Sequence, residues 1–180
     1  GHLGLQRMRT LWQMHLDLPD APPARPLPPG MTLRPFVVGA DEAEFLRVNN
    51  AAFDWHPEQG GWGVEQVQAR EAEPWFDAEG FLLAVDADDR LLGYHWTKIH
   101  TSPERIGEVY VLGVDPAAQG TGLGGVLTVA GLRHLHARGL RHVLLYVESD
   151  NEAAVRVYRK LGFSLRHSDV LFARSSEDVH

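Results

Sequence analysis

The sequence predicts a mixed α/β fold built on a twisted, mostly antiparallel sheet that carries helices on both faces. Two observations predict this class: apolar, strand-like runs follow one another over residues 81–114, and two units of strand and helix follow over residues 107–162. Successive hairpins pair antiparallel, whereas a helix between two strands brings the second strand back parallel, so the two patterns together make a mixed sheet. At 180 residues, 44% of them apolar, the chain can bury one large core and is short for two.

A strand and two helices are expected before the central sheet. TLRPF, residues 32–36, has the composition of a short strand. Asp41 and Glu44 have the spacing of a capping box, and the apolar residues of 45–53 recur on one helical face, so a helix is expected to begin there. The pattern over residues 64–75 predicts a second helix.

The centre of the sheet is predicted to contain three strands. FLLAV, residues 81–85, and LLGYHWTKI, residues 91–99, flank a turn around DADD and predict an antiparallel hairpin. GEVYVLGV, residues 107–114, is expected to be the next strand. These runs have few polar interruptions, which is typical of buried strands.

Two helices and two strands complete the predicted fold. Apolar positions three and four apart over residues 123–138 predict an amphipathic helix that a glycine ends. HVLLYV, residues 142–147, is a strand candidate. Ser149 and Glu152 have the spacing of a second capping box and predict another helix, after which residues 163–174 supply the last strand.

A proline-rich segment divides the chain. Residues 19–30 hold six prolines, which favours an extended linker and excludes a helix. The main domain is therefore expected over residues 31–174, followed by a tail of residues 175–180. Before the linker, HLGLQRMRTLWQM aligns weakly with KLGFSLRHSDVLF near the end of the chain. Residues 1–18 are thus either the closing strand of a preceding, mostly absent domain of the same kind or an arm packed on the surface.

Composition and charge exclude several classes of protein. The formal net charge is −7 with scattered acidic residues, which argues against nucleic acid as a partner and favours a small molecule. No apolar run is long enough for a membrane span and no secretory leader is recognisable, so a cytoplasmic location is expected. The chain has no cysteine, which removes disulfides and thiolate zinc sites, and its ten histidines form no HExxH pattern, so no metal is expected.

The stretch VDPAAQGTGLGG, residues 114–125, joins a predicted strand to a predicted helix through four glycines. Backbone N–H groups converge at such a junction and the helix dipole adds partial positive charge, so the loop is a candidate anion site. The stretch is not a Walker A sequence, since no Gly-Lys-Ser/Thr follows, and it falls short of a GxGxxG fingerprint. A merely flexible connection is the alternative.

Two motifs resemble those of the GNAT N-acetyltransferases. VDPAAQGTGLGG resembles the family's pyrophosphate-binding motif, Gln/Arg-x-x-Gly-x-Gly/Ala, with Gln119, Gly122 and Gly124 at the defining positions. DNEAAVRVYRKLGF resembles a later motif, in which an Asn-containing helix start precedes a Tyr and then Leu-Gly-Phe. The resemblance covers about residues 31–174. It implies the GNAT fold, with a splayed central strand pair at the acetyl-CoA site, and the transfer of acetyl from acetyl-CoA to a primary amine.

The resemblance also implies the residues that hold acetyl-CoA. They lie on the strand before the loop, on the loop and on the helix of the second motif, and are Leu112, Gly113, Val114, Gln119, Gly120, Thr121, Gly122, Leu123, Gly124, Gly125, Asn151 and Tyr158. The N–H of Leu112 would donate to the thioester oxygen, and Tyr158 would protonate the CoA thiolate. Gly113 is expected to form a bulge that parts its strand from the strand of residues 142–147. Without the motif, Tyr158 would be taken for a core residue.

Within this family the sequence most resembles the C-terminal domain of the mycothiol synthases, on NNAAFDWHPEQGGW, GYHWTKIH and LYVESDNEAAVRVYRKLGF. Those enzymes acetylate the cysteinyl amine of a cysteine–glucosamine–inositol conjugate and consist of two tandem GNAT domains, of which the second is active. By this resemblance Glu108 is the general base, acting through water, and Glu58, Lys98 and Glu108 contact the substrate. A preceding GNAT domain of the same polypeptide would be a partner.

Three other interpretations stay open. The chain could acetylate another amine, such as an amino acid, an aminoglycoside or a polyamine. It could bind acyl-CoA as a sensor without turnover, or serve only as an interaction module. Each predicts a different result with acetyl-CoA and a panel of amines.

Overall fold

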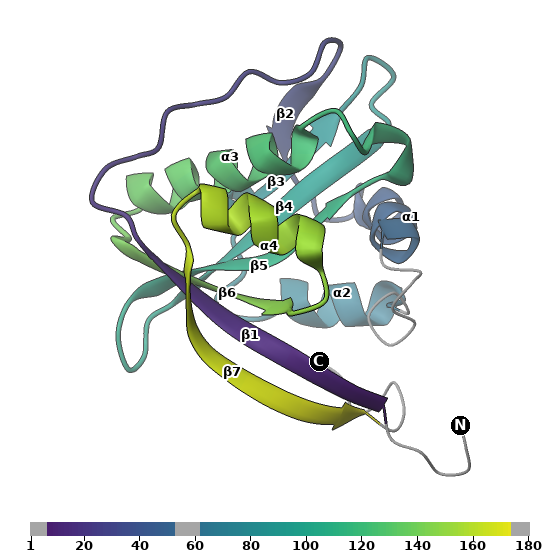
Figure 1. The fold of residues 1–180 in the computed structure, drawn as a ribbon. Helices are drawn as coiled ribbons and strands as arrows, with labels where there is room; N and C mark the ends of the chain where they lie inside the picture. The colour runs from purple at the N-terminus through teal and green to yellow at the C-terminus, as the bar shows by residue number, and fades with distance from the viewer. Residues whose placement is uncertain (1–6, 53–61, 174–180) are drawn as a thin grey trace.

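The computed structural model describes residues 7–52 and 62–173, which form one sheet with helices on both faces (Figure 1). The strand order is β2-β3-β4-β5-β6-β1-β7, and every neighbouring pair is antiparallel except β5 and β6. In chain order the strands and helices are β1 (Arg7–Asp17), β2 (Thr32–Pro35), α1 (Glu42–Ala52), α2 (Val64–Glu71), β3 (Phe81–Val85), β4 (Leu91–His100), β5 (Ile106–Val114), α3 (Leu123–Ala137), β6 (His142–Glu148), α4 (Glu152–Lys160) and β7 (Ser164–Ala173). The mixed, mostly antiparallel fold expected from the sequence is confirmed.

Two helices cover each face of the sheet. α3 and α4 lie in front of it in Figure 1, and their apolar residues, among them Leu132 and Tyr158, share a core with β1, β5 and β6. On the other face, Phe45 of α1 packs edge-on against Trp96 of β4, at a distance of 5.7 Å between ring centroids. Because side chains alternate along a strand, those of the central strands face one helix pair or the other.

No helix within the described ranges is long and apolar enough to cross a membrane.

β5 and β6 are paired over only part of their length. Their parallel ladder joins Gly107–Val109 to Val143–Leu145, although β5 continues to Val114 and β6 to Glu148. Beyond Val109, the described strands give the β6-facing edge of β5 no ladder partner. The splayed central strand pair expected from the sequence is present.

The bulge in β5 lies at Tyr110. The register between β4 and β5 shifts between Val109 and Val111, so Tyr110 is the extra residue. The prediction of a bulge at Gly113 is therefore wrong, because Gly113 pairs regularly with Tyr94. Gly113 instead makes room for a ring: a Cβ there would lie 2.6 Å from the Tyr94 hydroxyl oxygen.

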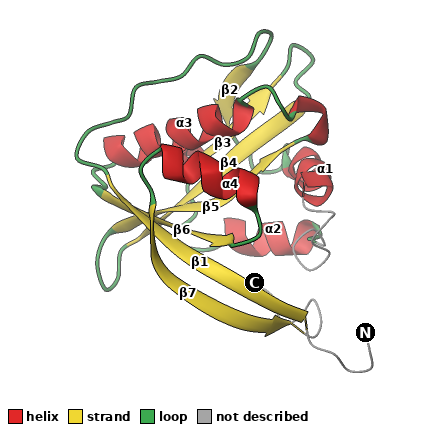
Figure 2. Cartoon of the chain, viewed as in Figure 1, coloured by secondary structure: helices red, strands yellow, loops and turns green. Residues whose placement is uncertain are grey.

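The first strand lies inside the sheet. β1 pairs antiparallel with β6 on one side and with β7 on the other (Figure 2). The proline-rich segment then runs as a loop to β2, at the opposite edge of the sheet, and α3 holds it: Arg133 Nη1 donates to the Pro22 carbonyl oxygen at 2.8 Å. β1 thus belongs to the same sheet as the strands that follow the linker. That residues 1–18 close a preceding domain stays a prediction.

The start of α1 differs from the predicted capping box. The Asp41 carboxylate accepts two hydrogen bonds from Arg34, both at 2.8 Å, and one from the Val37 N–H at 2.7 Å. Glu44 accepts from the Leu91 N–H at 3.1 Å. Both acids of the expected box therefore serve tertiary contacts.

Two further helix ends differ from the prediction. The capping box expected at Ser149 is absent, because the Ser149 N–H donates to β1. Asn151, also an expected cap of this helix, does cap α4: its side chain accepts from the Ala154 N–H at 3.3 Å. α2 ends at Glu71 and not at residue 75. A proline three residues further on disfavours helical backbone in the residue before it.

Candidate active site

The glycine-rich loop leads from β5 into the first turn of α3. Gly120 and Gly122 have φ angles of 84° and 85°, in the left-handed region that favours glycine because it has no Cβ. A Cβ on either residue would meet nothing within 4 Å. The first N–H groups of a helix have no intrahelical partner, which suits an anion site. At the start of α3 the Leu123 N–H donates to the Thr121 hydroxyl oxygen at 3.3 Å.

A buried acid fixes the start of this loop. Asp115 is 5% exposed, and its carboxylate accepts from the Ala117 N–H at 3.0 Å and from Arg47 Nη1 at 2.7 Å. Burial raises the pKa of Asp115, but these hydrogen bonds outweigh it and the pKa is lowered. Arg47 also donates to the Leu91 carbonyl oxygen at 2.8 Å and pairs with Glu44. Arg47 therefore ties α1 and β4 to the loop.

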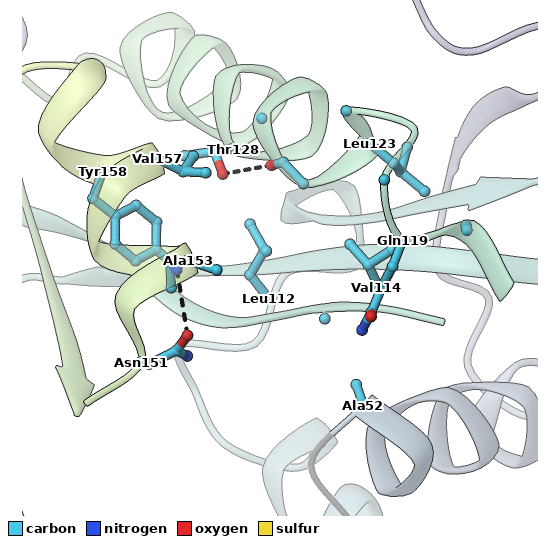
Figure 3. Close-up of a pocket in the computed structure, with 17 residues that line it drawn as sticks. Ala52, Leu112, Val114, Gln119, Leu123, Thr128, Asn151, Ala153, Val157 and Tyr158 are labelled. Carbon is cyan, nitrogen blue, oxygen red and sulfur yellow. Dashed lines mark hydrogen bonds between the residues drawn. The ribbon is translucent and has the colours of Figure 1, made fainter. Parts of the chain in front are cut away.

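A cavity of about 570 Å³ opens beside the loop (Figure 3). Parts of α1, β5, the loop, α3 and α4 line it, through Ala52, Leu112, Gly113, Val114, Ala118, Gln119, Gly120, Gly122, Leu123, Gly124, Gly125, Thr128, Asn151, Ala153, Ala154, Val157 and Tyr158. Of the residues predicted to hold acetyl-CoA, all but Thr121 are in this set. The Thr121 hydroxyl instead donates to the Ala118 carbonyl oxygen at 2.6 Å, inside the loop. The cavity gathers these residues, and their binding role stays a prediction.

Tyr158 and Leu112 face the cavity from opposite sides. Figure 3 shows the Tyr158 ring on α4 across from the Leu112 side chain on β5. The ring is 8% exposed and lies 5.7 Å from the Phe163 ring, between centroids. Burial raises the pKa of Tyr158 to about 12, so the phenol keeps its proton at neutral pH. Tyr158 is thus a core residue whose protonated phenol ring also borders the cavity; its role as the acid stays a prediction.

Glu108, predicted as the base, lies in a second cluster of polar groups that does not line this cavity. It pairs directly across β4 and β5 with Lys98, and its Oε1 shares a hydrogen bond of 2.6 Å with His100 Nε2. Glu108 is 6% exposed. Burial raises its pKa, while the hydrogen bond and charge of His100 and the charge of Lys98 oppose that rise. Lys98 Nζ lies 4.5 Å from the centre of the Trp75 ring and 5.1 Å from that of Tyr110.

The structure therefore places two of the three predicted substrate contacts, Lys98 and Glu108, side by side. Glu58 lies outside the described residues. The sequence reasoning missed His100 and Arg47. His100 follows Lys98 by two positions on one strand, so strand alternation could have placed both on one face, whereas no local signal marks Arg47. Within residues 7–52 and 62–173, no three His, Cys, Asp or Glu side chains gather into a metal site.

A glycine loop at a helix N-terminus, beside a strand pair that parts, is the arrangement of an acyltransferase fold. Residues 49–163 match the acetyltransferase (GNAT) family, and the chain belongs to that family. Among curated relatives, a mycothiol acetyltransferase of Actinosynnema mirum is 59% identical over 171 residues, which are 95% of this chain and 57% of that protein. One of Nocardia farcinica is 57% identical and matches 95% of this chain and 58% of its own length. The chain thus spans less than two thirds of these relatives.

A solved structure agrees. The GCN5-related N-acetyltransferase from Sphaerobacter thermophilus superposes with a TM-score of 0.75 at 30% sequence identity. The match covers 93% of this chain and 52% of that one.

Proposed function

We propose that this chain is the catalytic domain of an enzyme that transfers acetyl from acetyl-CoA to the cysteinyl amine of cysteine–glucosamine–inositol, the last step of mycothiol synthesis. The observation that carries the proposal is the cavity that runs from the glycine loop to the buried phenol of Tyr158. Relatives that are more than half identical to this chain are named mycothiol acetyltransferases, which supports this choice of acceptor. The expected cytoplasmic location remains part of the proposal.

The residues around the cavity fit acetyl-CoA. The glycine loop and the first turn of α3 would offer N–H donors to a pyrophosphate, and the glycines allow close approach. Within this stretch the N–H groups of Gln119 and Leu123 already donate, to the Pro116 carbonyl oxygen and the Thr121 hydroxyl oxygen. The β6-facing edge of β5 beyond Val109, which lacks a ladder partner among the described strands, can pair with the amide groups of a pantetheine arm. Acetyl-CoA supplies the activated acetyl group, and the chain supplies donors, an acid and a base.

Two groups at the cavity act on the thioester end. The N–H of Leu112 would donate to the carbonyl oxygen as negative charge develops there. Tyr158 holds its proton at neutral pH because burial raises its pKa to about 12. The phenol would give this proton to the departing thiolate. It would transfer a proton faster than bulk water, because it is already positioned at the cavity.

Glu108 would take the proton of the attacking amine, directly or through water. Its raised pKa makes it a better base than an exposed carboxylate. Lys98, next to it, would contact the polar acceptor together with Glu58. Because Glu108 does not line the acetyl-CoA cavity, the acceptor would enter from the face of α1 and α2 and meet the thioester where β5 and β6 part.

The test is acetylation of an amine panel by the purified chain. We expect cysteinyl-glucosaminyl-inositol to be acetylated with a kcat/KM at least about tenfold above that for amino acids, aminoglycosides or polyamines, since a site built for polar groups rejects analogues that lack them. If the chain prefers another amine, that amine replaces cysteinyl-glucosaminyl-inositol as the proposed acceptor. Binding of acetyl-CoA without turnover of any amine, despite a rise in melting temperature, would favour an acyl-CoA sensor.

A further inference from the structure

His100 lies beside Glu108, the proposed base, and has no role in the transfer reaction as proposed above. His100 Nε2 lies 2.6 Å from Glu108 Oε1, and the side chains are 33% and 8% exposed. His100 is at the end of β4, and Glu108 near the start of β5. The hydrogen bond thus joins a buried carboxyl group to a ring that reaches solvent.

We propose that His100 carries the proton from Glu108 to solvent after each transfer, a role that rests on the proposed function of Glu108. The amine N–H bond breaks and its proton binds the Glu108 carboxylate. The carboxyl O–H bond then breaks as the proton passes to His100 Nε2, and the ring releases a proton from Nδ1 to water. Among the described residues Nδ1 has no hydrogen-bond partner, and the His100 side chain is 33% exposed, so Nδ1 can exchange protons with water. Glu108 is then ionised again, and exchange of the Nε2 proton for one at Nδ1 through water returns the ring to its starting tautomer, so that charge and protons balance over the cycle.

The described groups around Glu108 leave His100 as the route by which its proton reaches solvent. From β4, Lys98 contributes charge to Glu108, and its ammonium group lies against the rings of Trp75 and Tyr110. From β6, the residue paired with Glu108 is Leu144, which cannot carry a proton. From α2, Arg70 Nε is occupied by the Tyr110 hydroxyl at 2.8 Å. Within the described ranges, His100 is the titratable group that both touches Glu108 and reaches water.

The pH profile is the first test. His100 holds the pKa of Glu108 down, so removing it raises that pKa. In His100→Ala the acidic limb of kcat/KM against pH should move up by about one unit, and kcat at pH 7, which includes the return of Glu108 to its ionised form, should fall about tenfold or more. His167→Ala is the matched control, because His167 faces Asp169 at 3.0 Å in an exposed pair on β7. An unmoved limb in His100→Ala overturns the proposal.

A conservative variant separates proton transfer from simple positioning. Gln at residue 100 keeps an N–H donor but cannot pass a proton on. His100→Gln should therefore be as slow as His100→Ala, and added imidazole should restore activity to the alanine variant. Near wild-type rates in His100→Gln, or no rescue by imidazole, would reduce His100 to a structural role.

A third measurement needs no turnover. The ¹³C signal of the Glu108 carboxyl group should titrate about one pH unit higher in His100→Ala than in the wild type. If the wild type acetylates no amine, the proposed function fails, and this titration still decides whether the two groups are coupled. An unshifted Glu108 midpoint in a folded variant overturns the coupling itself.

Discussion

The contact between Gly113 and Tyr94 predicts a large cost for one added methyl group. A Cβ in Gly113→Ala would lie 2.6 Å from the Tyr94 hydroxyl oxygen and 2.8 Å from Cζ, distances that require a shift. Tyr94 is fully buried and donates to Asn49 Oδ1 at 2.5 Å. The Phe45 ring, with its centroid 4.7 Å from that of Tyr94, blocks an easy retreat.

The cost can be worked from these contacts. Overpacking of a dense core costs about 1–3 kcal/mol, and loss of the hydrogen bond to buried Asn49 costs about 1–3 kcal/mol more. We therefore expect Gly113→Ala to lower the free energy of unfolding by about 2–6 kcal/mol, measured by urea denaturation. In the pair Gly113→Ala with Tyr94→Phe, the nearest clashing atom is gone. The double variant should cost at least about 1 kcal/mol less than the sum of the single variants.

Gly124→Ala is the control for this experiment. A Cβ there would meet only Val114 Cγ2, at 3.8 Å, and alanine favours a helix over glycine by about 0.5–1 kcal/mol. Stability should stay equal or rise. If Gly113→Ala were within about 0.5 kcal/mol of the wild type, or if the cycle with Tyr94→Phe were additive, the steric reasoning would be refuted.

Other residues give further predictions. Tyr158→Phe should lower kcat about 10²-fold with acetyl-CoA affinity nearly unchanged, by steady-state kinetics and calorimetry; a loss below about twofold would remove Tyr158 as the acid. Arg47→Met should weaken CoA binding about tenfold, as titration calorimetry would detect, because it frees the start of the glycine loop; equal affinity would contradict this. Burial, with Glu42 nearby, raises the pKa of Glu71 to about 7. A raised carboxyl pKa gives stability that is present below the unfolded value and is lost as pH rises through about 7. Glu71→Gln should therefore stabilise the protein by about 1–2 kcal/mol at pH 8 relative to pH 5, in thermal melts of the variant and the wild type at both pH values.

The residues that line the cavity could be predicted because their signals are local. Gln119, Gly122 and Gly124 stand within one loop, and Asn151 and Tyr158 within one helix and its cap. A strand that ends in a glycine loop and enters a helix carries its geometry in consecutive residues. Local sequence signals were therefore enough to identify residues that the structure brings together around one cavity.

The other side of the site depends on strand register, which the sequence does not reveal. The bulge lies at Tyr110, whose hydroxyl accepts from Arg70 Nε at 2.8 Å and whose ring stands at 90° to that of Trp96. Both contacts are tertiary, so the glycine at 113 was the stronger local signal and misled the prediction. The contact of His100 with Glu108 across the hairpin follows from the same register.

The helix starts show a similar limit. Asp41 and Ser149 have the right spacing to a following Glu, but spacing does not reveal competing partners. Arg34 from β2 takes the Asp41 carboxylate, and pairing with β1 takes the Ser149 N–H. A capping pattern therefore predicts a helix start more reliably than it predicts which side chains cap it.

The position of β1 sets the order in which the chain can fold. Leu11 faces Glu148 on one side and Asp169 on the other, so the first described strand must wait for the last two before its hydrogen bonds form. Such distant pairing is slow, because a long loop must close before any contact repays its entropy. On the ribosome, β1 would emerge before β6 and β7 and remain without its neighbours until both have been made. A polypeptide begun at Met31 would leave β6 and β7 with open edges where β1 belongs, and such edges recruit other chains.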